Sequence, residues 1–191
     1  MDGIESYFGA FNPKGIEGSQ YSSFRMTLSN GDDSLKMGLM VNPSLFKDNK
    51  TRLFTHIVDY MSTGPNSRES VWLLQSYDDL PKVGLWPTKA FGRFNDFGNQ
   101  ADWGGEVYSP LDQPSPPMGT GIHPHGDTSY AAHSHLIAIS YENSQSKFVN
   151  PGDAVLYESD PKSYSVSDSG YRNGYWRRLI LYDGPGGIKS D

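Results

Sequence analysis

The chain has 191 residues, a formal net charge of −6 and no cysteine. Without cysteine there can be no disulfide, no thiolate metal site and no cysteine nucleophile. No run of Lys and Arg forms the basic stripe that a phosphate backbone requires, which argues against nucleic acid as a partner. No apolar stretch approaches the length needed to cross a bilayer.

The composition favours an all-β protein. Aromatic residues make up 13% of the chain, beside 21 glycines and 13 prolines, a mixture typical of many short strands joined by tight turns. No long amphipathic helix pattern is present. A chain of this length can build one sizeable core, so we expect a single domain spanning residues 1–191.

Local patterns predict the strands in chain order. They cover residues 19–29, 34–42, 51–60, 70–77, 134–142, 153–159 and 174–183. The sequence "SDSG" at residues 167–170 predicts a turn, and the two prolines of "DLPKVGLWPTKAFG" indicate an edge strand or an irregular connection. Together these elements predict an antiparallel β-sandwich of two packed sheets.

The predicted strand at residues 34–42 alternates clearly between two faces. The apolar face, which we expect in the core, carries Leu35, Met37, Leu39 and Val41. The open face carries Ser34, Lys36, Gly38, Met40 and Asn42.

A second segment, "ADWGGEVYSP" (residues 101–110), places a glutamate in the same kind of setting. Trp103 and Val107 share one strand face, whereas Gly104, Glu106 and Tyr108 share the other. Glycine beside a charged residue on an open face leaves room for another chain to approach. We therefore expect a groove for an extended ligand, formed by Gly38, Met40, Gly104 and Tyr108 around Lys36 and Glu106. The alternative is that Glu106 is an ordinary exposed residue paired with Lys36.

Several motifs follow one another along the chain: "YFGAFNP", "VNPSLFKDNKTRLFT", "SVWLLQSYDDLPKVGLWP", and "DWGGEVYSP" followed by "PPMGTG". In this order they resemble the neprosin family of plant glutamic peptidases, which cleave near proline. The resemblance runs from about Tyr7 to about Tyr182. It implies a β-sandwich, a pair of catalytic glutamates and secretion, although the first residues lack the basic and apolar regions of a signal peptide.

The resemblance implies that Glu106 is one of the two glutamates and that the other position, six residues before "NP", holds Lys36. A two-carboxylate hydrolase needs one protonated acid and one ionised base. A lysine in place of one carboxylate instead favours the ionised form of its neighbour and lowers its pKa. Glu106 could alternatively act with a neutral amide such as Gln75. Gln75 could instead be a hydrogen-bonded amide of the core or a residue at the sheet edge.

Two functions follow from this pattern. The first is an endopeptidase that hydrolyses proline-containing peptides, with Glu106 activating water. The second is a non-catalytic protein that uses the groove to bind a peptide, a glycan or another protein, as a toxin or lectin-like module would. The 12 tyrosines and 4 tryptophans could stack on sugar or proline rings, although most such rings pack in cores.

Four of the five histidines lie within 14 residues of one another, at positions 123, 125, 133 and 135. Residues two apart on a strand point the same way, so His123 with His125, and His133 with His135, could each offer two imidazoles to Zn²⁺ or Cu²⁺, with Asp127 as a further ligand. The alternatives are ordinary polar-face histidines or a pH-responsive cluster. We expect the remaining histidine, His56, to be structural.

Overall fold

The computed structural model describes residues 1, 3–9, 11–58, 71–75, 82–87, 97–141, 147–152 and 154–187. For residues 71–75 and 82–87 the description is limited to the backbone. The elements are β1 (Gly3–Phe8), β2 (Tyr21–Asn30), β3 (Asp33–Val41), α1 (Pro43–Phe46), β4 (Arg52–Val58), β5 (Val71–Gln75), β6 (Lys82–Pro87), β7 (Gln100–Tyr108), β8 (His133–Ser140), β9 (Phe148–Val149), β10 (Ser165–Tyr171) and β11 (Arg178–Asp183).

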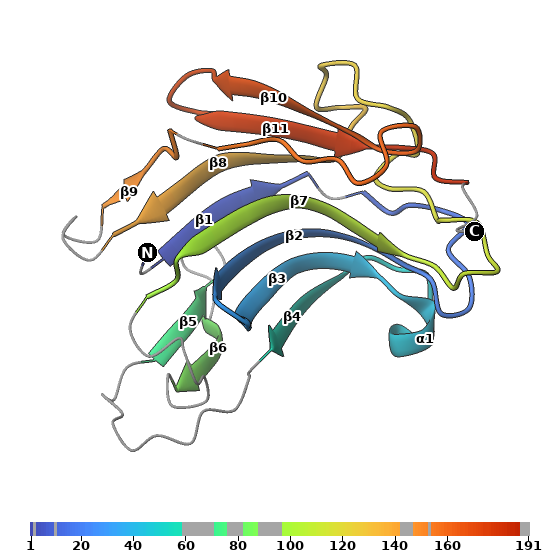
Figure 1. Ribbon diagram of the computed structural model, residues 1–191, viewed down its shortest axis with the longest axis horizontal. Coiled ribbons are helices and arrows are strands. Elements are labelled where there is room, and N and C mark those ends of the chain that lie inside the picture. The colour runs from blue at the N-terminus through green and yellow to red at the C-terminus, as the bar shows by residue number, and fades with distance from the viewer. Residues whose placement is uncertain are drawn as a thin grey trace.

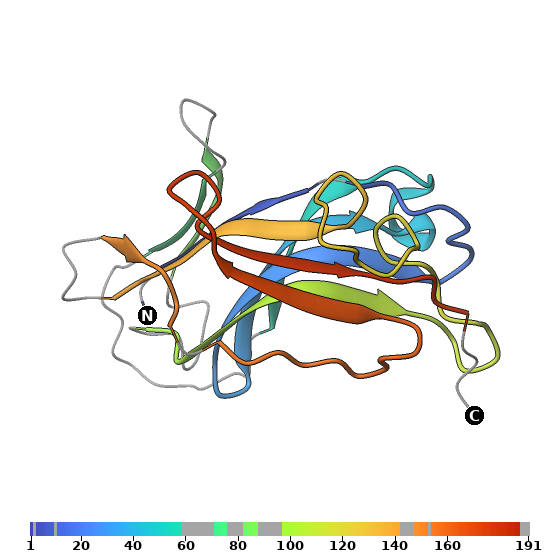
Figure 2. The ribbon, with the colours of Figure 1, turned by 90° about the horizontal axis from the view of Figure 1, so that it is seen from above.

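The strands form two packed antiparallel sheets, which confirms the predicted all-β sandwich (Figures 1 and 2). Sheet A has the order β1-β8-β11-β10, with β9 added to β8, and sheet B has the order β4-β3-β2-β7. The β5–β6 hairpin forms a separate two-stranded sheet. Among the described residues, no helix is long and apolar enough to cross a membrane.

The core lies between the two sheets, and the predicted core faces of β3 and β7 are confirmed. Buried side chains from both sheets form its main cluster, which includes Phe24, Met118, Ile137, Ile180 and Tyr182. Leu39, Trp103 and Val107 pack against that cluster. Each fully buried side chain of this size contributes about 1.5–3 kcal/mol. The residues that alternate with this core face along β3 and β7 lie on the other face of sheet B.

A buried carboxylate at the end of β11 holds the loop that follows β7. Asp183 has no exposed surface and accepts hydrogen bonds from the backbone nitrogens of Thr120, Gly121, Ala132 and Gly184 at 2.7–3.1 Å. The Thr120 hydroxyl donates another at 2.9 Å. The motif "PPMGTG" therefore wraps around the Asp183 carboxylate, because a buried carboxylate must be fully hydrogen-bonded.

Two local predictions differ from the structure, and one strand was not predicted. Residues 154–158, within the strand predicted at 153–159, have no regular secondary structure. The predicted turn at 167–170 lies inside β10, where the register shifts between Asp168 and Tyr171 and Gly170 adopts a positive φ of 64°. This irregularity is a β-bulge, which uses the same residue types as a turn. The sequence also gave no signal for β1, which is half-buried on both faces.

Candidate functional site

The open face of sheet B carries three rows of residues across β3, β2 and β7. Residues that are directly opposite in an antiparallel ladder point to the same side. The register gives the rows Met40–Ser23–Glu106, Gly38–Arg25–Gly104 and Lys36–Thr27–Asp102. Lys36 and Glu106 thus share a face, as predicted, but their strands are not neighbours, because β2 lies between them.

Glu106 lies at the centre of a hydrogen-bonded network. Its Oε2 accepts from Lys36 Nζ at 2.8 Å and from Arg25 Nε at 2.8 Å. Its Oε1 accepts from the Tyr21 hydroxyl at 2.8 Å. The side chains of Glu106, Lys36 and Arg25 are 20–24% exposed, so water screens these charges less than it would on an open surface. Both carboxylate oxygens are therefore already engaged by protein donors.

The network keeps Glu106 ionised. Burial by itself would raise the pKa of Glu106, but hydrogen bonds from Lys36 and Tyr21 and the charges of Arg25 and Lys36 outweigh burial and lower it. Burial, together with the neighbouring Glu106 carboxylate, raises the pKa of Tyr21 above its usual range, so the phenol keeps its proton. Glu106 is thus a stabilised anion that accepts hydrogen bonds from three groups.

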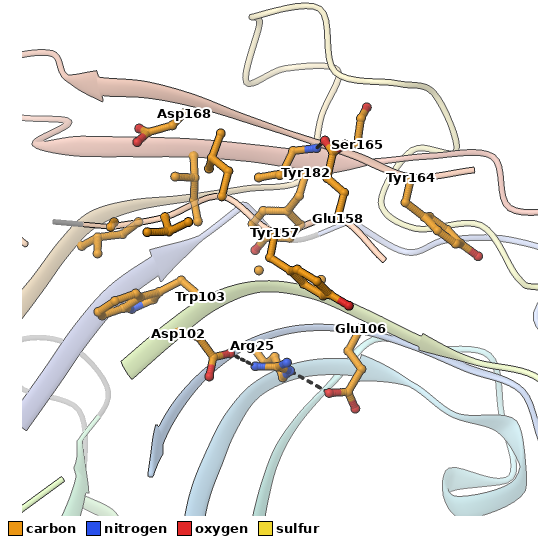
Figure 3. A pocket seen from close by; sticks show the side chains of 18 of the residues that line it. Arg25, Asp102, Trp103, Glu106, Tyr157, Glu158, Tyr164, Ser165, Asp168 and Tyr182 are labelled. Atoms are coloured by element: carbon orange, nitrogen blue, oxygen red, sulfur yellow. Dashed lines mark hydrogen bonds and ion pairs between the residues drawn. The ribbon is translucent and has the colours of Figure 1, made fainter. Parts of the chain in front are cut away.

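Arg25 extends the network to Asp102, on the other side of Gly104. One of its terminal nitrogens contacts the Asp102 carboxylate in a short ion pair and donates to the Thr27 hydroxyl at 2.7 Å. Although burial favours the neutral form, the Asp102 and Glu106 carboxylates raise the pKa of Arg25 further. Figure 3 shows Arg25 between the two carboxylates.

Sequence reasoning missed Tyr21, Arg25 and Asp102. The available signal was the polar alternation of residues 21, 23, 25 and 27 in the predicted second strand, which places them on the open face once β2 is known to lie between β3 and β7.

The two glycines of the predicted groove differ in their surroundings. A Cβ at Gly38 would overlap the Phe24 carbonyl oxygen and lie 2.8 Å from Arg25 Cα, whereas a Cβ at Gly104 would meet nothing within 4 Å. Gly38 is therefore required by the close approach of β2, and only Gly104 leaves open space on the face. Of the other predicted groove residues, Tyr108 is exposed and stacks on Tyr21 at 5.7 Å between ring centroids, and Met40 contacts the Asn42 amide.

Gln75 lies in β5, which pairs only with β6 in the described structure and is not part of sheet B. Its side chain lies outside the described residues, so its predicted partnership with Glu106 stays a prediction.

The histidines do not gather as one four-ligand set. Among the described residues, no three His, Asp or Glu side chains lie close enough together to hold a metal ion. His123 contacts the Ser165 hydroxyl on β10 at 2.9 Å. His133 and His135 lie side by side on β8, as predicted, with ring centroids 5.5 Å apart. They pack among Tyr7, Tyr175 and Trp176, so each ring has aromatic neighbours.

A cleft of about 410 Å³ opens beside β7. One wall is formed by the seven consecutive β7 residues 101–107, and the opposite wall by residues 154–159 together with side chains of β10 and β11. Gly104 and Glu106 are the predicted groove residues that line it. In Figure 3, Glu106 lies below the β7 ribbon and the Tyr157 ring is drawn across it; both residues line the cleft.

Comparison with known proteins identifies the family of the chain. A search of curated proteins finds no match to the chain. A family model described as Neprosin matches residues 18–66 and 61–185, which include every strand of sheet B and the cleft. The match spans most of the chain, and the chain therefore belongs to the neprosin family.

Proposed function

We propose that this neprosin domain binds an extended ligand chain beside Glu106 and does not hydrolyse it by a two-carboxylate mechanism. The observation that carries the proposal is the 2.8 Å ion pair between Lys36 Nζ and Glu106 Oε2. Lys36 occupies the position that the resemblance to the neprosin motif implies for the second glutamate. A cation there cannot hold the shared proton that two adjacent carboxylates arrange by repulsion.

The hydrogen bonds of Glu106 support the same conclusion. A general base needs a free lone pair directed at water, and a general acid needs a proton. Three protein donors occupy three of the roughly four lone-pair sites of the Glu106 carboxylate, which leaves about one for water, and its lowered pKa keeps it from acting as the acid. Asp102, the other carboxylate of the network, is paired with Arg25. The network thus favours a fixed, charged recognition surface, and an extended peptide or glycan is the class of ligand that it would hold.

The test is incubation of a proline-containing peptide with the protein from acid to neutral pH, followed by mass spectrometry. We expect no cleavage above the buffer blank. Cleavage by the wild-type protein that Glu106→Gln abolishes would overturn the proposal.

A gain-of-function variant makes the test sharper. Lys36→Glu restores two facing carboxylates, and we expect it to create hydrolysis at acid pH. Lys14→Glu, which reverses the same charge at an exposed position away from the site, is the matched control and should stay inactive. A folded but inactive Lys36→Glu protein would show that these two positions do not form the catalytic pair.

One observation favours hydrolysis as a second candidate function. The Tyr21 hydroxyl lies 2.8 Å from Glu106 Oε1 and stays protonated at neutral pH. If a substrate carbonyl took over this hydrogen bond, Tyr21 would polarise the carbonyl while Glu106 activated water. Wild-type cleavage that is lost in Tyr21→Phe would identify this route.

A further inference from the structure

We infer that the free edge of β7 is a docking site for an extended, basic segment of another polypeptide, which adds to sheet B as a strand. The inference rests on the proposed ligand binding beside Glu106 and names the class and the binding mode of that ligand.

The first observation is the open edge itself. In the described structure β7 pairs with β2 on one side only. In an antiparallel ladder, alternate residues direct their N–H and C=O groups toward one neighbour and the others away from it. Half of the β7 backbone groups therefore face the cleft, whose wall is the unbroken run of residues 101–107. A polypeptide strand has backbone donors and acceptors at the matching spacing, and a glycan does not.

The second observation is an exposed apolar segment in the opposite wall, residues 154–157. Val155 is 89% exposed and Tyr157 is 83% exposed, and both line the cleft. Apolar side chains that project this far from an irregular segment indicate a surface that a partner covers. A strand laid along β7 would cover them, because the alternate side chains of that strand point toward this wall.

The third observation is how the second wall is attached. The Pro151 carbonyl accepts from Arg178 of β11 at 2.5 Å, and the Glu158 carboxylate accepts from the Val166 nitrogen of β10 at 2.7 Å. Residues 154–157 between these points are thus tethered to sheet A, whereas β7 belongs to sheet B. A strand can enter between the two walls without breaking either tether.

Charge identifies the basic character of the partner. Four carboxylates line the cleft, those of Asp102, Glu106, Glu158 and Asp168. Three cations lie against them, Arg25 and Arg178 in the lining and Lys36, which is paired with Glu106, so one negative charge remains in excess. The excess of negative charge on the walls, in a chain of net charge −6, attracts a segment that carries lysine or arginine and repels an acidic one.

Three fluorescein-labelled decapeptides test the inference by fluorescence anisotropy. The first alternates threonine and lysine, the second has glutamate in place of lysine, and the third is the lysine peptide methylated on every backbone nitrogen, which blocks both of its hydrogen-bonding edges. We expect the first to bind at least tenfold more tightly than either of the others. Equal affinity of the methylated peptide would overturn strand addition, equal affinity of the glutamate peptide would overturn the charge argument, and no binding of the lysine peptide would overturn both.

Variants and hydrogen exchange locate the site. Tyr157→Ala should weaken binding of the lysine peptide at least threefold, and Tyr130→Ala, at a similarly exposed tyrosine outside the cleft, should leave it unchanged. Bound peptide should slow exchange of the β7 amides, and protection confined to other strands would contradict the assignment. A dimer that forms through β7 and excludes the peptide would also overturn it.

The same samples separate this inference from the proposed function. Cleavage of the lysine peptide, detected by mass spectrometry, would contradict the proposed lack of hydrolysis. Strand addition would then be tested by comparing the affinities of the lysine peptide and the methylated peptide for the Glu106→Gln variant.

Discussion

Two glycines on the open face of sheet B allow a sharp test of the packing argument. Gly38 and Gly104 have the same φ of 158°, so replacing either with alanine adds a similar backbone strain of about 1 kcal/mol. They differ in their surroundings. A Cβ at Gly38 would overlap the Phe24 carbonyl oxygen, whereas a Cβ at Gly104 would meet nothing within 4 Å. The difference in the free energy of unfolding between the two variants therefore measures the cost of forcing β2 and β3 apart.

The expected magnitude follows from what must move. In Gly38→Ala the overlapping atom is backbone, so β2 and β3 must separate and weaken ladder hydrogen bonds that contribute about 1 kcal/mol each, in addition to overpacking of about 1–3 kcal/mol. We expect Gly38→Ala to be about 3 kcal/mol less stable than Gly104→Ala. For a chain of this size, that is a difference of roughly 6–12 °C in Tm. Thermal unfolding followed by circular dichroism measures it, and equal stability of the two variants would refute the assigned strand packing.

Three other predictions concern charge and pH. In a double-mutant cycle of Glu106→Gln and Lys36→Gln, urea unfolding at pH 7 should give a coupling energy of about 1 kcal/mol, since the pair is only partly buried; additive effects would contradict the ion pair. The pKa of Glu106 is lowered from an ordinary 4.5, so its contribution to stability is complete above pH 4.5 and is lost as pH falls through the folded-state pKa. The free energy of unfolding should therefore fall less on acidification in Glu106→Gln than in the wild type. Parallel curves of unfolding free energy against pH for the two proteins, in the acid range, would be evidence against the network. Burial, with a smaller contribution from His133, lowers the pKa of His135 from 6.5, so the wild-type protein should lose stability as pH falls below 6.5, and His135→Phe should lose less. The control is His56→Phe, at an exposed histidine. An identical pH dependence of stability in all three proteins would show that His135 does not titrate as expected.

Much of the fold followed from local patterns. The alternation in β3 and β7 correctly placed Lys36 and Glu106 on the open face and Leu39 and Val107 toward the core, because side-chain direction in a strand depends only on position parity. The motifs also led to the family that the comparison shows.

The remaining features depend on contacts that a local pattern does not contain. The network around Glu106 could not be assembled without knowing that β2, with Arg25, lies between the two predicted strands. Gly38 was interpreted as space for a ligand, but its environment is set by the β2 backbone. Residues 154–158 include the strand-forming types Val155, Leu156 and Tyr157, yet no neighbouring strand pairs with them in the described structure. Whether a segment forms a strand depends on a neighbouring strand that pairs with it, and that neighbour can lie far away in the sequence.

The position of β11 has a consequence for synthesis of the protein on the ribosome. This strand follows every other described strand in the sequence, yet it lies in the interior of sheet A between β8 and β10. Its Asp183 carboxylate holds the loop at residues 118–121. A nascent chain that stops before residue 178 has an open edge on β8 and no anchor for that loop. Sheet A can therefore close only after β11 has left the ribosome, and until then the β8 edge stays unpaired on that side.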